Sequence, residues 1–125
     1  MKTFLILFIS VLMLSSCGND DTITNTTIKV DLEIVVSGTL SDSPIIKYRA
    51  SNGELIEEVL SAPITWTKTF NVQKGFNLFL KTTGTLEGNI SIKANAKGGD
   101  VNSINENQFG SRSPSSFDLE VNKDL

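Results

Sequence analysis

The stretch IKVDLEIVV, residues Ile28–Val36, decides the fold of this chain. Apolar side chains occupy every even position of the stretch, while charged side chains occupy positions 29, 31 and 33. Successive side chains of a β-strand point to opposite faces, so a period of two predicts a strand with one buried and one solvated face. Strands of a parallel sheet are covered on both faces and would be apolar throughout. The stretch therefore favours an antiparallel sheet.

The same alternation recurs along the chain, between segments that carry Gly, Pro or Asn. Further strands are predicted at residues 45–50, 54–60, 64–72, 76–83, 89–96 and 116–121. Turns are predicted at 41–44, 52–53, 74–75, 84–88 and 98–100, and the Asn52-Gly53 pair is the strongest hairpin signal. About seven short strands without a helical stripe predict an all-β fold, an antiparallel immunoglobulin-like β-sandwich.

The segment 101–114 is polar and rich in Ser and Asn. Its composition predicts a mobile loop, with at most one short strand near Val101–Ile104. Phe109 lies in this segment without a periodic partner, so it is either an exposed contact residue or tucked under the loop.

The chain lacks most of the side chains that catalysis uses. It has no His and a single Cys among 125 residues, which removes the commonest general base and the commonest metal ligand. Glu57 and Glu58 are adjacent on a predicted strand and therefore point to opposite faces, so they cannot act as a glycosidase pair. The sequence predicts a protein that is not an enzyme, with no metal site and no cofactor.

Trp66 invites comparison with the aromatic platforms that bind sugars. Its parity matches that of Ile64, Phe70 and Val72, which favours a position in the core. Tyr48 shares the parity of Ile46 and is expected to be half-buried, with its hydroxyl at the rim.

The N-terminal region has the pattern of a secretory signal peptide. Lys2 precedes an apolar run from Phe4 to Leu14, which is shorter than the roughly 20 residues of a membrane-spanning helix. Leu14-Ser15-Ser16-Cys17 resembles the lipobox of bacterial lipoproteins. This resemblance implies a signal peptide at 1–16, cleavage before Cys17 and attachment of lipid to Cys17, with acylation of the new amino terminus.

Residues 17–27 are predicted to form the lipidated N terminus and a flexible acidic tether, followed by a β-sandwich domain at 28–125. Asp20-Asp21 resembles the acidic surface-export signal of some Gram-negative lipoproteins; a solvated linker is the alternative reading. Asp21-Thr22-Ile23 matches a short O-glycosylation pattern known in the same setting, which makes Thr22 a candidate attachment site.

A second resemblance concerns the β domain. Tyr48, Asn52-Gly53, Pro63 with Trp66, and Lys68 with Gly75 follow an order that resembles MmpS-type transport accessory proteins. This resemblance implies an immunoglobulin-like sandwich at the cell envelope and a role beside an exporter. The chain departs from that family in having a lipobox instead of an N-terminal transmembrane helix.

Together these features predict a Gram-negative outer-membrane lipoprotein, displayed on the surface if the acidic signal operates. Without Lys2, 14 acidic residues outnumber 10 basic ones, so nucleic acid is not an expected partner. The leading hypothesis is a protein that binds an envelope partner or assists a transport or assembly system. The alternative is a glycan- or ligand-binding module that uses loop-end residues between Asn95 and Arg112.

Overall fold

The computed structural model describes residues 26–60 and 65–125. Six strands make up most of this part of the chain, and every pair of neighbours is antiparallel. They are β1 (Ile28–Leu40), β2 (Ile45–Arg49), β3 (Leu55–Val59), β4 (Thr65–Val72), β5 (Asn77–Gly98) and β6 (Val101–Asp124). The predicted all-β, antiparallel class is confirmed.

The six strands form one continuous sheet that is built on β5. β6 pairs along one edge of β5, while β1 and β2 follow one another along its other edge. Leu40 of β1 lies opposite Leu86, and Ile45 of β2 lies opposite Thr83, so β1 and β2 lie end to end along β5. β4 and β3 pair in the same way with the outer edges of β1 and β2. The sheet therefore consists of four long ribbons, in the spatial order β3/β4, β1/β2, β5 and β6.

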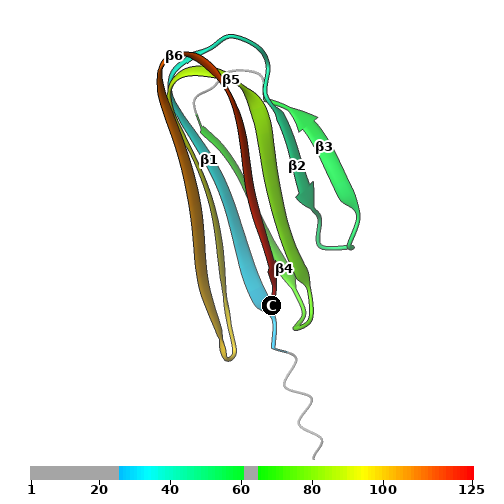
Figure 1. The fold of residues 1–125 in the computed structure, drawn as a ribbon. Coiled ribbons are helices and arrows are strands. Elements are labelled where there is room, and N and C mark those ends of the chain that lie inside the picture. The colour runs from blue at the N-terminus through cyan, green and yellow to red at the C-terminus, as the bar shows by residue number, and fades with distance from the viewer. Residues whose placement is uncertain (1–25, 61–64) are drawn as a thin grey trace, which may run out of the picture.

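The long ribbons bend over at one end, which gives the sheet the form of a half-barrel (Figure 1). Gly38 and Gly88 lie opposite one another at this bend, with φ angles of 127° and 132°. A Cβ atom on Gly38 would overlap the carbonyl oxygen of Glu87, and one on Gly88 would overlap that of Ser37. Only glycine permits both the positive φ and this close approach of two backbones.

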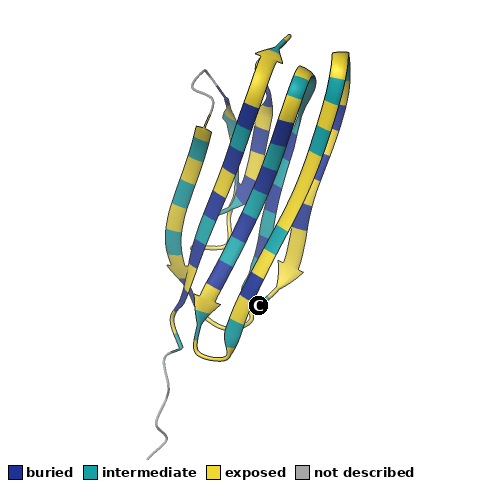
Figure 2. Ribbon diagram, turned by 90° about the vertical axis from the view of Figure 1, so that its left-hand side faces the viewer, coloured by how far each residue is buried: buried dark blue, intermediate teal, exposed yellow. Residues whose placement is uncertain are grey.

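The bend divides the sheet into two limbs whose inner faces pack on one another. The first limb contains β1, β4, residues 86–98 of β5 and residues 101–111 of β6; the second contains β2, β3, residues 77–85 of β5 and residues 115–124 of β6. Buried positions alternate with more exposed ones along the strands (Figure 2). The alternation predicted for residues 28–36 is confirmed, since all five even positions are buried.

The core is aliphatic, with one aromatic residue from each of two strands. Its buried members are Ile28, Val30, Leu32, Ile34, Val36, Ile46, Tyr48, Leu60, Val72, Leu78, Leu80, Leu86, Ile90, Ile92, Ala94, Ala96, Phe117, Leu119 and Val121. Because each limb contributes one face to this core, burial of apolar surface holds the two limbs together.

The prediction of about seven strands in a two-sheet immunoglobulin-like sandwich is not confirmed, because the described residues form six strands of one sheet. Two expectations about the chain are wrong. The turn predicted at 84–88 is an irregularity inside β5, where the register with β6 shifts between Leu86 and Gly88. The loop predicted at 101–114 lies within β6, which pairs with β5 on both sides of the bend.

In the part of the chain that the structure describes, no helix is long and apolar enough to cross a membrane.

Candidate functional site

A cluster of four side chains from three strands joins the two limbs at the β3–β4 edge of the sheet. We call it the Glu58 cluster: Tyr48 of β2, Glu58 of β3, and Trp66 and Lys68 of β4. Tyr48 Oη donates to Glu58 Oε1 at 3.1 Å, and Trp66 Nε1 donates to Glu58 Oε2 at 3.0 Å. Lys68 Nζ lies 3.2 Å from Glu58 Oε1. One carboxylate therefore receives three donors from two neighbouring segments.

The aromatic rings of the cluster reinforce this arrangement. Tyr48 and Trp66 meet edge to face, with ring centroids 5.3 Å apart. Lys68 Nζ lies 5.8 Å from the Tyr48 ring centroid and 5.9 Å from that of Trp66. These distances suit aromatic pairing and a cation–π contact, both of which add to the ion pair.

The electrostatics of the cluster follow from these contacts. The hydrogen bond from Trp66 is the largest cause of a lowered pKa at Glu58, with Lys68 and Tyr48 acting in the same direction. The hydrogen bond to Glu58 raises the pKa of Lys68. Burial, followed by the hydrogen bond to Glu58, raises the pKa of Tyr48. Each shift stabilises the protonation state present at neutral pH.

This chemistry suits a structural joint better than proton transfer. A general base works best with a pKa near the operating pH, whereas the pKa of Glu58 moves away from it. The cluster links β3 to β4 through the contacts of Glu58 with Trp66 and Lys68.

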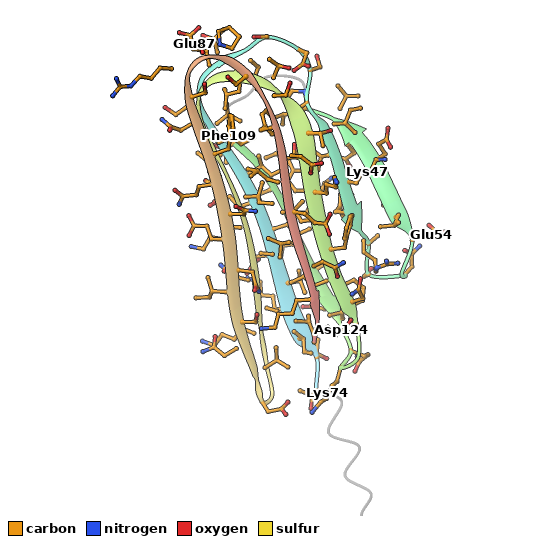
Figure 3. The ribbon with its side chains drawn as sticks, viewed as in Figure 1. Lys47, Glu54, Lys74, Glu87, Phe109 and Asp124 are labelled. Atoms are coloured by element: carbon orange, nitrogen blue, oxygen red, sulfur yellow. The ribbon has the colours of Figure 1, made fainter. Side chains whose placement is uncertain are left out.

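The aromatic residues singled out in the sequence are placed by this geometry. Trp66 is half-buried and packs against the core, as its parity predicted. Tyr48 is more buried than expected, at 5% exposure, and its hydroxyl is satisfied by Glu58. Phe109 is half-buried just below the bend and lies 6.0 Å from the ring of Phe117, so it tucks inward instead of forming an exposed contact (Figure 3).

The outer face of the second limb carries an apolar patch, which we call the β3 patch. Leu55 and Val59 are 59% and 61% exposed, and Ile45, which pairs with Val59, is 38% exposed. Lys47 lies on the same outward-facing side of β2 (Figure 3) and forms an ion pair of 3.2 Å with Glu57. The patch thus combines exposed aliphatic side chains with a charged pair between them.

The outer face of the first limb is polar by contrast. A hollow there, which we call the polar hollow, is lined by Asp31, Leu32, Glu33, Thr67, Thr69, Lys93 and Asn95. Thr69 Oγ1 donates to Asp31 Oδ1 at 2.7 Å. Asn95 Oδ1 is buried and has no hydrogen-bond partner among the described residues. The hollow offers carboxylate, hydroxyl and amide groups side by side.

Several residues predicted from the sequence lie outside the described residues. These are the lipidation site Cys17, the acidic pair Asp20 and Asp21, and the candidate glycosylation site Thr22, together with the signal peptide. The residues between Asn95 and Arg112 were expected at loop ends, but all except the 99–100 turn belong to β5 and β6. Within residues 26–60 and 65–125, no three His, Cys, Asp or Glu residues are grouped so that they could hold a metal ion.

Sequence reasoning missed the role of Glu58. Glu57 and Glu58 do point to opposite faces, since Glu57 is exposed while Glu58 is half-buried in the cluster. The sequence did contain a signal for this role. Glu58 has the same parity as Ile56, which places its carboxylate on the inner face of the strand, and a carboxylate there needs a donor such as the indole N–H of Trp66.

No family model, curated protein or solved structure matches this chain. Its function is therefore inferred from the fold and from the surfaces described above.

Proposed function

We propose that this chain is a non-catalytic, lipid-anchored protein of the Gram-negative outer membrane, whose β domain acts by contact with an envelope protein. In this proposal it assists a transport or assembly system, as its resemblance to transport accessory proteins implies. Two limbs that bury a common core resemble the two layers of an immunoglobulin-like sandwich, and we propose that the half-barrel serves the same purpose as a rigid contact module.

The observation that carries this proposal is the β3 patch. Three large aliphatic side chains share one outward face at the edge of the sheet, where the Glu58 cluster fixes the position of β3. Exposed apolar side chains that are grouped together mark protein contact sites more often than isolated ones do. The large aromatics give no comparable sugar-binding platform, because Tyr48 is buried and Trp66 is half-buried with its indole N–H bonded to Glu58.

A photo-activated cross-linking amino acid at Val59 tests the contact. We expect it to capture an envelope protein in intact cells, because Val59 lies at the exposed edge of the patch. The matched control carries the same amino acid at Lys29, which is exposed on the outer face of the first limb. Equal capture at both positions, or none at Val59, would contradict a contact through the patch.

The anchor is tested separately with Cys17→Ala. Loss of the acylated sulfur removes the lipid, so the variant is expected to leave the detergent phase in phase separation, whereas the parent chain stays in it. A variant that still partitions with detergent would show that lipid on Cys17 does not hold the protein at the membrane.

The polar hollow favours a second candidate, a surface-displayed glycan- or ligand-binding module. Asn95 Oδ1, which has no hydrogen-bond partner among the described residues, lies on the strand next to Asp31, in a hollow that Thr67 and Thr69 also line. This set of groups suits a hydroxyl-rich ligand. Binding on a glycan array that is lost in Asn95→Leu but kept in Asn71→Leu, a change on the exposed part of β4, would favour this candidate over the first.

A further inference from the structure

The outer edge of β6 is the longest unpaired strand edge in the described part of the chain. β6 runs for 24 residues and pairs only with β5 among the described strands. Its two halves flank a second hollow, which is distinct from the polar hollow and is lined by residues 104–107 and 120–122. The edge of β6 is therefore open to solvent there. An open edge presents a row of backbone donors and acceptors that another strand can bind.

The first half of this edge lacks the features that protect natural sheet edges. Residues 101–110 contain one charged side chain, Glu106, and neither Lys nor Pro. The opposite edge of the sheet is made of β3 and β4, which are five and eight residues long and carry three charged residues. Of the two edges, that of β6 is the one suited to strand addition.

Backbone orientation makes Ile104, near the start of β6, available for pairing at this open edge. The Gln108 amide donates to the side chain of Asn107 instead of to β5, which shows that its N–H points outward. Alternate residues share an orientation, so the amide and carbonyl of Ile104 also point outward. Its side chain is 68% exposed, the highest value among the large hydrophobic residues of the described chain.

We propose that two copies of this chain pair through β6, antiparallel, about a two-fold axis at Ile104. This register places Ile104 opposite Ile104 of the second copy and Glu106 opposite Asn102, so it buries the exposed aliphatic pair and opposes no like charges. Centring the axis on Ser103 opposes Glu106 to Asp100, and centring it on Glu106 opposes two carboxylates. Centring it on Asn105 places Ile104 against Glu106. Only an axis at Ile104 itself sets the two exposed isoleucines directly opposite each other, so the side chains favour this register.

This pairing would join residues 101–107 of the two copies, so that the first limbs of two half-barrels become one continuous sheet. It is independent of the β3 patch, which lies at the opposite edge of the sheet and stays accessible in the pair. A self-complementary edge of this kind forms a closed pair instead of a fibre, because one edge of each copy is used once.

Disulfide cross-linking of the full chain tests the register. In Ile104→Cys the two thiols belong to directly opposite residues with Cα atoms about 5.5 Å apart, which suits a disulfide. We expect mild oxidation to give a covalent dimer linked through position 104. In the control Gln108→Cys, on the same face of the same strand, the two thiols would lie about 27 Å apart and should not join. The parent chain, oxidised in parallel, accounts for any disulfide through Cys17.

Sedimentation of the detergent-solubilised full chain gives the second measurement. Ile104→Lys opposes two ammonium groups and is expected to abolish the dimer, whereas the parent and Gln108→Lys remain dimeric. Far-ultraviolet circular dichroism checks that each variant is folded, since both positions are exposed and outside the core. A monomeric parent chain, or cross-linking no greater at 104 than at 108, would overturn the proposal. Covalent capture of a different protein by the thiol of the Ile104→Cys variant would overturn it as well.

Discussion

Glu58 shows how one polar side chain can complete a largely aliphatic core. Its two oxygens accept from Tyr48 and Trp66 and pair with Lys68, across the opening between β3 and β4. A half-buried carboxylate of this kind is stabilising only while its donors stay in place, because unsatisfied polar groups away from water are costly.

Glu58→Gln is expected to lower the free energy of unfolding by about 1–2 kcal/mol, since it removes the charge and replaces one acceptor with a donor. The matched control is Glu57→Gln on the outer face, whose exposed ion pair with Lys47 contributes about 0.5 kcal/mol or less. Urea unfolding followed by the fluorescence of Trp66, the sole tryptophan, measures both. Equal losses in the two variants would contradict the role given to the cluster.

The lowered pKa of Glu58 also sets the direction of a pH dependence. Its stabilising contribution is complete above the ordinary value of 4.5 and is lost as pH falls through the lower value of the folded protein, because the unfolded chain then binds more protons. The exposed Asp100, whose pKa is lowered by Lys74, acts in the same direction.

We therefore expect the urea midpoint to fall in acid, and to fall less steeply in Glu58→Gln than in the parent. At the alkaline end the raised pKa values of Lys68 and Tyr48 work the other way. Their contribution is complete below their ordinary values of 10.5 and 10.0 and is lost as pH rises from those values through the higher values of the folded protein. A flat acid limb in the parent would contradict the coupling of Glu58 to folding.

At the scale of the element, the bend is the feature that gives six strands the form of a half-barrel. Gly38 and Gly88 meet there in a close backbone approach, and the Glu87 irregularity in β5 lies beside them. Glu87 itself lies at the outer end of the fold, at the bend (Figure 3). The long ribbons can turn over without ending because the crease falls on residues that have no side chain to displace.

Gly88→Ala is expected to cost about 3 kcal/mol or more, since the new Cβ meets backbone atoms that cannot move aside. Gly53→Ala is the matched control. Its φ is 87° but nothing lies within 4 Å of the added atom, so only the backbone penalty of about 1–2 kcal/mol applies. Similar urea midpoints for the two variants would show that the crease tolerates a side chain.

The strands that the sequence predicted well are those whose own side chains alternate. Residues 28–36 are the clearest case, because the period of two is itself the signal for burial on one face. Two segments were predicted wrongly, for different physical reasons. Residues 84–88 at the bend contain glycines and therefore look like a turn, whereas residues 101–114 carry polar side chains that are typical of a loop. Their strand conformation comes from backbone pairing with β5, which sequence composition does not record.

The candidate site also depends partly on local alternation and partly on long-range pairing of strands. Alternation was enough to place Trp66 inward and to put Glu57 and Glu58 on opposite faces. The Glu58 cluster requires β3 and β4 to face one another across the bend, and that arrangement depends on residues far from either strand.

For the whole molecule, one sheet with one shared core predicts cooperative unfolding. Each limb exposes half of the core when it separates from the other, so neither has an apolar interior of its own. We expect urea transitions followed by Trp66 fluorescence and by far-ultraviolet circular dichroism to coincide. Two separated transitions would show that the limbs are independent units.

The position of β1 has a mechanical consequence. The described chain enters the sheet at Ile28, and β1 is held by β4 on one side and β5 on the other. Its ladder hydrogen bonds lie perpendicular to the strand, so a pull along the N-terminal segment loads both rows together in shear. A strand at the sheet edge, pulled sideways, would lose its bonds one at a time. We therefore expect β1 to resist a pull along its own axis more strongly than a strand at the sheet edge would.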